Sequence, residues 1–197
     1  MAKRQQSGFT SGKPLPVSMR LPGMRVSWRG PKTEAPRDTM PGNLKQTNFR
    51  ELAASLVPSQ SLVRVSRHRL EPSDCYSIGH IVGTGDEFLA LHKVGDRIDL
   101  DGYEILRFAD VTNLETDFST RDFVEKALAL KSLSPKALND IELSNARGLL
   151  QSLGKAFQLI VIERERVARD ECVIGRPIAI TDESASFRLI SPSAKWN

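Results

Sequence analysis

The chain has 197 residues, 40% of them hydrophobic, which is enough for one domain or two small domains with a buried core. Its longest unbroken aliphatic run, residues 159–162, is far shorter than the ~20 residues that a membrane-spanning helix needs, so we expect no membrane insertion. The two cysteines, Cys75 and Cys172, are too few and too far apart for a disulfide framework, which favours a cytoplasmic protein.

The net charge of +4 is concentrated at the N-terminus. Residues 1–50 contain ten Lys or Arg and two acidic residues, a balance of +8, so residues 51–197 carry −4. A mildly acidic body repels a phosphate backbone on average, so the high pI by itself does not predict nucleic-acid binding.

Residues 1–44 are predicted to be a disordered basic tail. Six of the eleven prolines lie there without apolar periodicity, and such a segment buries too little surface to offset its ordering entropy. Three readings of the tail stay open: an arm for nucleic acid or an acidic partner, a targeting presequence, or a start codon placed before the true start at Met40.

Residues 45–116 are predicted to form a helix followed by about five short strands. Asn48 is the expected N-cap residue, and Pro58 ends the helix. Asp101-Gly102 predicts a hairpin turn. The predicted strands are 62–70, 76–83, 88–94, 97–100, 103–108 and 111–115, which together outline a small barrel.

Residues 117–143 are predicted to be a helical connector. Ser119 or Thr120 is a suitable N-cap, and Ser134-Pro135 begins the connection to the next segment. The apolar residues of this helix are Phe123, Val124, Ala127, Leu128 and Leu130.

Residues 144–197 repeat the first part of 45–116. At an offset of 97, residues 48–75 align without a gap with residues 145–172, and after one deletion the offset becomes 96. Identical pairs include Asn48 and Asn145, Leu52 and Leu149, Leu56 and Leu153, Arg67 and Arg164, Cys75 and Cys172, and Gly79 and Gly175. The repeat predicts two copies of one helix-and-strand unit, with Ser144 or Asn145 capping the second helix and Gly154 at its C-terminal position.

The second unit lacks counterparts of the hairpin, the last strand and the trailing helix of the first. A barrel without its last strands has an unpaired edge. We therefore expect the second unit to be completed by residues 116–143 or by a partner subunit, or the gene to be truncated.

A helix followed by five short, strongly bent strands resembles the Sm-like and SH3-like small barrels. The segments 79–83, 89–92, 101–107 and 109–112 are also similar to an uncharacterised bacterial family with tandem barrels, and 165–167 with 172–176 resemble its second half. The resemblance covers residues 47–197. It implies a mainly β fold with short helices (α+β), built from two tandem Sm-like or SH3-like barrel units of which the second is incomplete, and it brings no catalytic motif.

Three histidines, His68, His80 and His92, recur every twelve residues on successive predicted strands, a spacing that is compatible with a metal site. Their counterparts Glu165, Arg176 and Arg188 would not rebuild such a site. We therefore predict ordinary surface positions, with no metal and no cofactor, and keep a three-histidine metal site as the alternative.

The candidate ligand-binding residues are two arginine pairs at equivalent positions, Arg67 with Arg69 and Arg164 with Arg166. At a period of two, each pair lies on one face of the first strand of its unit. They either contact an anionic ligand, RNA included, or pair with acidic residues such as Glu163, Glu165 and Glu171.

These observations predict a non-enzymatic interaction module that binds a protein partner or forms a homo-oligomer. The alternative is an Sm-like RNA-binding protein whose basic tail adds affinity. An enzyme is not expected, because the sequence shows no paired carboxylates, nucleophile-base arrangement or metal-spaced ligands.

Overall fold

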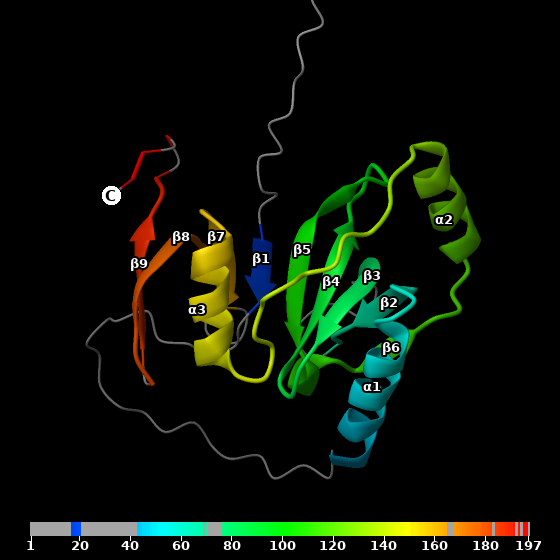
Figure 1. Ribbon diagram of the computed structural model, residues 1–197, viewed down its shortest axis with the longest axis horizontal. Helices are drawn as coiled ribbons and strands as arrows, with labels where there is room; N and C mark the ends of the chain where they lie inside the picture. Colours follow the sequence, from blue (N-terminus) through cyan, green and yellow to red (C-terminus); the bar gives the residue numbers. More distant parts are fainter. Residues whose placement is uncertain are drawn as a thin grey trace, which may run out of the picture.

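The computed structural model describes residues 17–20, 43–68, 70, 76–164, 168–182, 184–191, 193, 195 and 196. The described chain is mainly β with short helices, as the sequence predicts (Figure 1). Its elements are β1 (Val17–Arg20), α1 (Asn43–Leu56), β2 (Leu62–Ser66), β3 (Tyr76–Thr84), β4 (Phe88–Val94), β5 (Leu100–Arg107), the 3-10 helix η1 (Phe108–Asp110), β6 (Asn113–Glu115), α2 (Arg121–Leu130), α3 (Ala146–Ala156), β7 (Ile160–Arg164), β8 (Ala168–Ile180) and β9 (Ala185–Leu189).

The strands form an open sheet and do not close into barrels. Five antiparallel strands, in the order β6-β2-β3-β4-β5, make up the first half, and β7-β8-β9 make up the second. β1 lies between the halves and pairs in parallel with both β5 and β7. Two closed barrels would require β6 to pair with β5 in the first half and β9 to pair with β7 in the second, whereas β6 and β9 end the strand order and β5 and β7 both pair with β1. The prediction of two tandem barrels is therefore not confirmed.

Residues 17–20 were assigned to the disordered tail from the sequence, yet they form β1. A four-residue strand is too short to be recognised by its own periodicity, and its position depends on the edges of β5 and β7, which are far away in the sequence. The rest of the predicted tail before α1 lies outside the described residues.

The predicted helix boundaries are partly correct. The side chain of Asn145 accepts the backbone N–H of Gly148 (2.8 Å), so its role as an N-cap is confirmed. The cap prediction for Asn48 is wrong, because α1 begins at Asn43. Gly154 does not end a helix but lies inside α3, where an added Cβ would meet Cγ of Pro177 at 2.6 Å.

The predicted turn at Asp101-Gly102 is also wrong, because β5 runs through both residues. The chain turns earlier, where the N–H of Gly95 donates to the carbonyl of Asp99 and the N–H of Ile98 donates back to Gly95 (both 2.9 Å). Gly102 has a φ of 72°, and the pairing of β4 with β5 changes register between His92 and Val94. Gly102 therefore provides the positive φ that the backbone adopts where the pairing of β4 with β5 is irregular.

The strands of the two halves pair in the same register. Positions that align at offsets of 97 and 96 face aligned partners, and both hairpins have a bulge at the same place. The pair Val63↔Gly79 corresponds to Ile160↔Gly175, and the pair His80↔His92 corresponds to Arg176↔Arg188. The bulge of the first half lies between Ile81 and Gly83, and that of the second half lies between Pro177 and Ala179.

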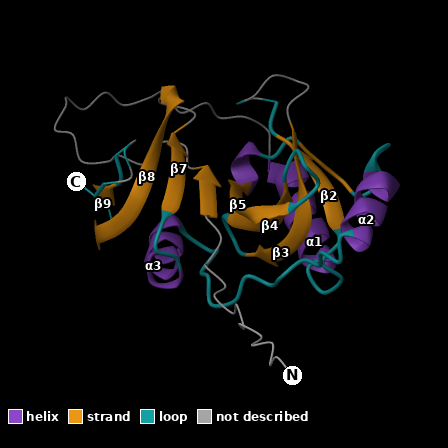
Figure 2. Cartoon of the chain, turned by 90° about the horizontal axis from the view of Figure 1, so that it is seen from above, coloured by secondary structure: helices purple, strands orange, loops and turns teal. Residues whose placement is uncertain are grey.

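The apolar core has three clusters, and successive residues of β4 point into different ones. Leu89 and Leu91 pack with Ala53 of α1, whereas Phe88 and Ala90 point to the opposite face, into a cluster that contains leucines of α3. This second cluster also contains Ile160 of β7, so the apolar side of α3 packs with residues of both halves, while Arg147, Gln151 and Lys155 on its other side are exposed. Figure 2 shows α3 beside β7 and β8, with α1 and α2 at the other end of the molecule.

The third cluster joins α2 to the first half. Val124 and Leu128 of α2 pack with Leu62, and with the partly buried Ile78 and Val94. None of the described helices combines the length and the apolar character that crossing a membrane requires.

Candidate functional site

Among the four candidate arginines, only Arg67 has a described side chain. It is 1% exposed and takes part in interactions within the folded chain. A guanidinium in this position is not accessible to a phosphate backbone, so Arg67 does not form the surface expected for RNA contact. The side chains of Arg69, Arg164 and Arg166 lie outside the described residues.

The structure brings together two of the three histidines. His80 on β3 is paired directly with His92 on β4, so both rings lie on the same face of the sheet. His68 lies beyond the far end of β2 and is exposed, with its N–H donating to Oγ1 of Thr112 (3.1 Å). In the described part of the chain, no three His, Cys, Asp or Glu side chains gather in a metal-binding arrangement.

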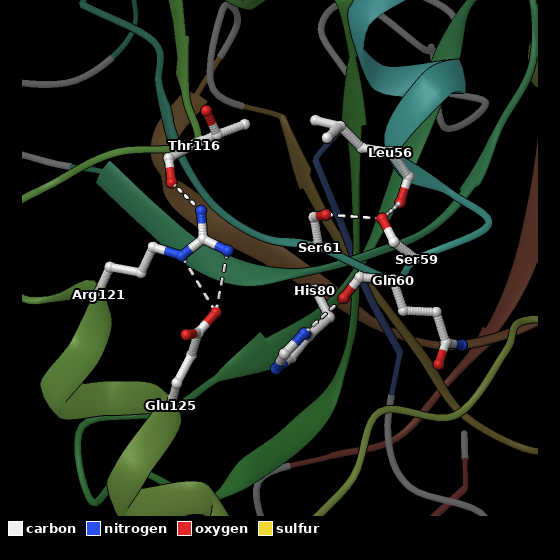
Figure 3. A network of polar contacts seen from close by, with 8 residues as sticks. All are labelled: Leu56, Ser59, Gln60, Ser61, His80, Thr116, Arg121 and Glu125. Carbon is white, nitrogen blue, oxygen red and sulfur yellow. Dashed lines mark hydrogen bonds and ion pairs between the residues drawn. The ribbon is translucent and has the colours of Figure 1, made fainter.

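The hydrogen bonds of the two rings fix different tautomers. Nδ1 of His80 is 2.7 Å from the carbonyl oxygen of Gln60, which can only accept, so Nδ1 carries the proton (Figure 3). Nδ1 of His92 accepts the N–H of Lys136 (3.0 Å), so a neutral ring carries its proton on Nε2. Both Nε2 atoms are buried without a hydrogen-bond partner among the described residues. Because Nε2 of His92 is protonated, it is not a metal ligand in this state.

The burial of this pair has a consequence for pH. Burial lowers the pKa of His92 to about 4 from 6.5, and it also lowers the pKa of His80. As the pH falls, His80 and His92 are therefore protonated in the unfolded chain before they are protonated in the folded chain. The stability that neutral rings provide is complete above pH 6.5 and is lost as the pH falls toward 4.

We predict that His92→Asn flattens the dependence of unfolding free energy on pH. In the wild-type chain, His92 alone accounts for a loss of about 2 kcal/mol between neutral pH and pH 5. Asparagine retains an acceptor for the N–H of Lys136 but does not titrate. Urea unfolding across this range measures the slope, and replacing the exposed His68 by Asn is the matched control, expected to leave it unchanged. Equal slopes for wild type and His92→Asn would contradict the prediction.

A cavity of about 620 Å³ lies beside α3. Its lining residues are Asn139, Asp140, Glu142, Gly148, Gln151, Ser152, Lys155 and Ala156. The carboxylate of Glu142 accepts the backbone N–H of Ser144 (2.8 Å), which lowers the pKa of Glu142. Glu142 thus stabilises the turn that leads into α3, and we assign no ligand to this cavity.

The second half of the molecule has a sheet face that no apolar cluster of the described residues covers. We call it the open face, and it comprises Val161, Cys172, Ile174, Arg176, Arg188 and Ile190, together with Ile178 at the β8 bulge, which also borders a pocket beside Leu150 and Gly154 of α3. The register places Val161 opposite Ile174 and Arg176 opposite Arg188, while α3 packs on the other face against Ile160 and Ile162. Arg176, Ile178, Arg188 and the free thiol Cys172 are exposed.

The counterparts of the open face in the first half are covered. Ile78 and Val94, which align with Ile174 and Ile190, pack against α2. Val82 aligns with Ile178 and is 5% exposed in the cluster that contains the α3 leucines, whereas Ile178 is 67% exposed. The two halves therefore differ in what lies on this face rather than in how their strands pair.

The open face is basic as well as apolar. Arg176 and Arg188 lie directly opposite each other, and like charges at such positions destabilise a strand pair. The guanidinium of Arg188 lies over the ring of Trp196 at 5.8 Å from its centroid. Neither arginine forms an ion pair with another described residue. This arrangement suits an incoming group with negative charge and an apolar surface.

Sequence reasoning missed the open face as a site. The period-two spacing of Ile174 and Arg176, and of Arg188 and Ile190, was available as a signal. The second half has arginines at the positions that align with His80 and His92, and at the sequence level these arginines served only as an argument against a metal site.

Comparisons of the chain with protein-family models, with curated proteins and with solved structures gave no match.

Proposed function

We propose that this protein is a non-enzymatic interaction module that associates with protein chains through the open face. The observation that carries the proposal is the exposure of Ile178 together with the opposed arginines, at positions whose counterparts in the first half are buried or partly buried. Uncovered apolar surface of this kind is characteristic of binding sites. The proposed partners are a protein or a second copy of the chain, in the cytoplasm.

The proposal includes a tandem architecture. Residues 45–116 and 144–197 are two copies of one helix-and-strand unit related to the Sm-like and SH3-like folds, joined by the connector 117–143. Its support is the shared register, the shared bulge position, and the glycines Gly79 and Gly175. An added Cβ at Gly79 would lie 2.8 Å from the carbonyl oxygen of His92. An added Cβ at Gly175 would overlap the carbonyl oxygen of Arg188, the residue that aligns with His92.

RNA binding in the manner of Sm-like proteins is the second candidate. The observation that favours it is the exposed pair of arginines beside Trp196, because guanidinium groups bind phosphates and an indole can stack on a base. The main difference between the candidates is salt dependence, since binding through phosphates weakens steeply as salt rises.

Affinity capture with the purified, tagged full chain tests the proposed function. We expect the wild-type chain to retain a protein from an extract of its own cells after nuclease treatment and at raised salt, and Ile178→Glu to lose it. The matched control is Leu130→Glu on α2, which alters an even more exposed apolar residue away from the open face. Loss of the captured material with nuclease or with modest salt would instead indicate RNA, and retention by Ile178→Glu would overturn the role of the open face.

A further inference from the structure

We infer that the open face binds α1 of a second copy of the chain, so that copies associate head to tail. This inference rests on the proposed function and names the partner of the same surface. The proposed contact repeats, between two chains, the contact that α3 makes with the first half inside one chain.

The internal contact provides the template. In the cluster between the two halves, Val82 at the bulge of the first hairpin is buried together with Leu149 and Leu153 of α3. The first half thus accepts a helix on this face, and the second half supplies that helix. Ile178 aligns with Val82, the accepting position. Leu52 and Leu56 of α1 align with Leu149 and Leu153 of α3.

The accepting position and one of the two helix residues of a second contact of this type are exposed. Leu149 is 0% exposed in the cluster that α3 shares with both halves, whereas the aligned Leu52 is 39% exposed, and Leu56 already packs partly against the cluster beneath α1. Ile178 is 67% exposed where Val82 is buried. Because α1 and the open face lie at opposite ends of the molecule, Leu52 cannot reach Ile178 within one chain (Figure 1). A second copy of the chain can bring Leu52 and Ile178 together. It must lie next to the first copy in the same relative orientation that the second half has to the first half within one chain.

Charge favours this arrangement over pairing of two open faces. Two such faces in contact would bring four arginines together, Arg176 and Arg188 from each copy, without compensation. In contrast, α1 presents the exposed Glu51 and Arg50 next to Leu52, whose charges balance, so this pairing brings no uncompensated cluster of like charges together. A contact between unlike surfaces leaves one α1 and one open face free in every dimer, so it propagates into larger assemblies unless a ring closes.

Sedimentation velocity and light scattering of the full chain test the inference. We expect the mass of the wild-type protein to rise with concentration beyond a dimer. Leu52→Glu and Ile178→Glu should each weaken association by about a hundredfold, because each places a charge in an apolar contact. Leu130→Glu is the control and should associate like the wild type.

Mixing the two variants gives the sharpest result. The Leu52→Glu chain retains its open face and the Ile178→Glu chain retains its α1, so an equimolar mixture should form a one-to-one dimer and nothing larger. Circular dichroism of each variant establishes that it is folded. A monomeric wild type at every concentration, or a mixture that stays monomeric, overturns the inference, as does dissociation caused by Leu130→Glu.

These outcomes separate the inference from the proposed function. If the open face captures a protein but the purified chain stays monomeric, a different protein is the partner and only the head-to-tail inference fails. If neither capture nor self-association depends on Ile178, both fail.

Discussion

Gly175→Val is expected to destabilise the fold by about 3 kcal/mol or more, the range of severe steric overlap with a rigid neighbour. A Cβ at position 175 would overlap the carbonyl oxygen of Arg188 on the adjacent strand. A carbonyl in a paired strand cannot move away by changing a rotamer, so the strands would have to separate. Gly79→Val should have a similar effect, because its Cβ would lie 2.8 Å from the carbonyl oxygen of His92.

Chemical denaturation followed by circular dichroism measures this loss. Gly95→Val is the matched control, because Gly95 lies in the turn between β4 and β5 and the nearest atom to an added Cβ there is Cβ of the exposed Asp101 at 3.2 Å, which leaves more room than a backbone carbonyl at 2.8 Å or less. Valine favours extended structure more than glycine does. An unchanged or raised stability of both Gly175→Val and Gly79→Val would therefore show that the strands do not approach each other as described.

Leu150→Ala should destabilise both halves of the molecule together, by about 3 kcal/mol. Leu150 is 0% exposed in a cluster that also contains Phe88 of the first half and Ile160 of the second. Removing its side chain leaves a cavity where α3 packs with residues of both halves of the sheet. Because the cluster is shared, we expect a single cooperative transition at a lower denaturant concentration.

Hydrogen exchange tests the cooperative part of this prediction. Amides of β4 in the first half and of β7 in the second should lose protection by the same amount in Leu150→Ala. Leu130→Ala is the control, since Leu130 is 87% exposed and its removal should change stability by less than about 0.5 kcal/mol. Loss of protection confined to β7–β9 would show that the halves are independent domains.

The amino-acid sequence by itself determined the local elements and the correspondence between the halves. Periodic runs located β3 and β4 closely, and the sequence narrowed the N-cap of α3 to Ser144 or Asn145, of which Asn145 accepts a hydrogen bond from Gly148, three residues away. The alignment at offsets of 97 and 96 matched residues that are paired in the same register. These features depend on residues that are close in the chain, or on residues that match when the sequence is aligned with itself.

Only the tertiary structure decided how the strands are arranged and what covers them. That β1 lies between β5 and β7, that Gly102 serves a bulge rather than a turn, and that Arg67 is buried all depend on segments distant in the sequence. Ile178 and Val82 are similar residues at aligned positions, yet one is exposed and the other is buried. The physical reason is that burial depends on the neighbouring segment, here Leu143 and the α3 leucines that share a cluster with Val82, and local periodicity does not specify that neighbour.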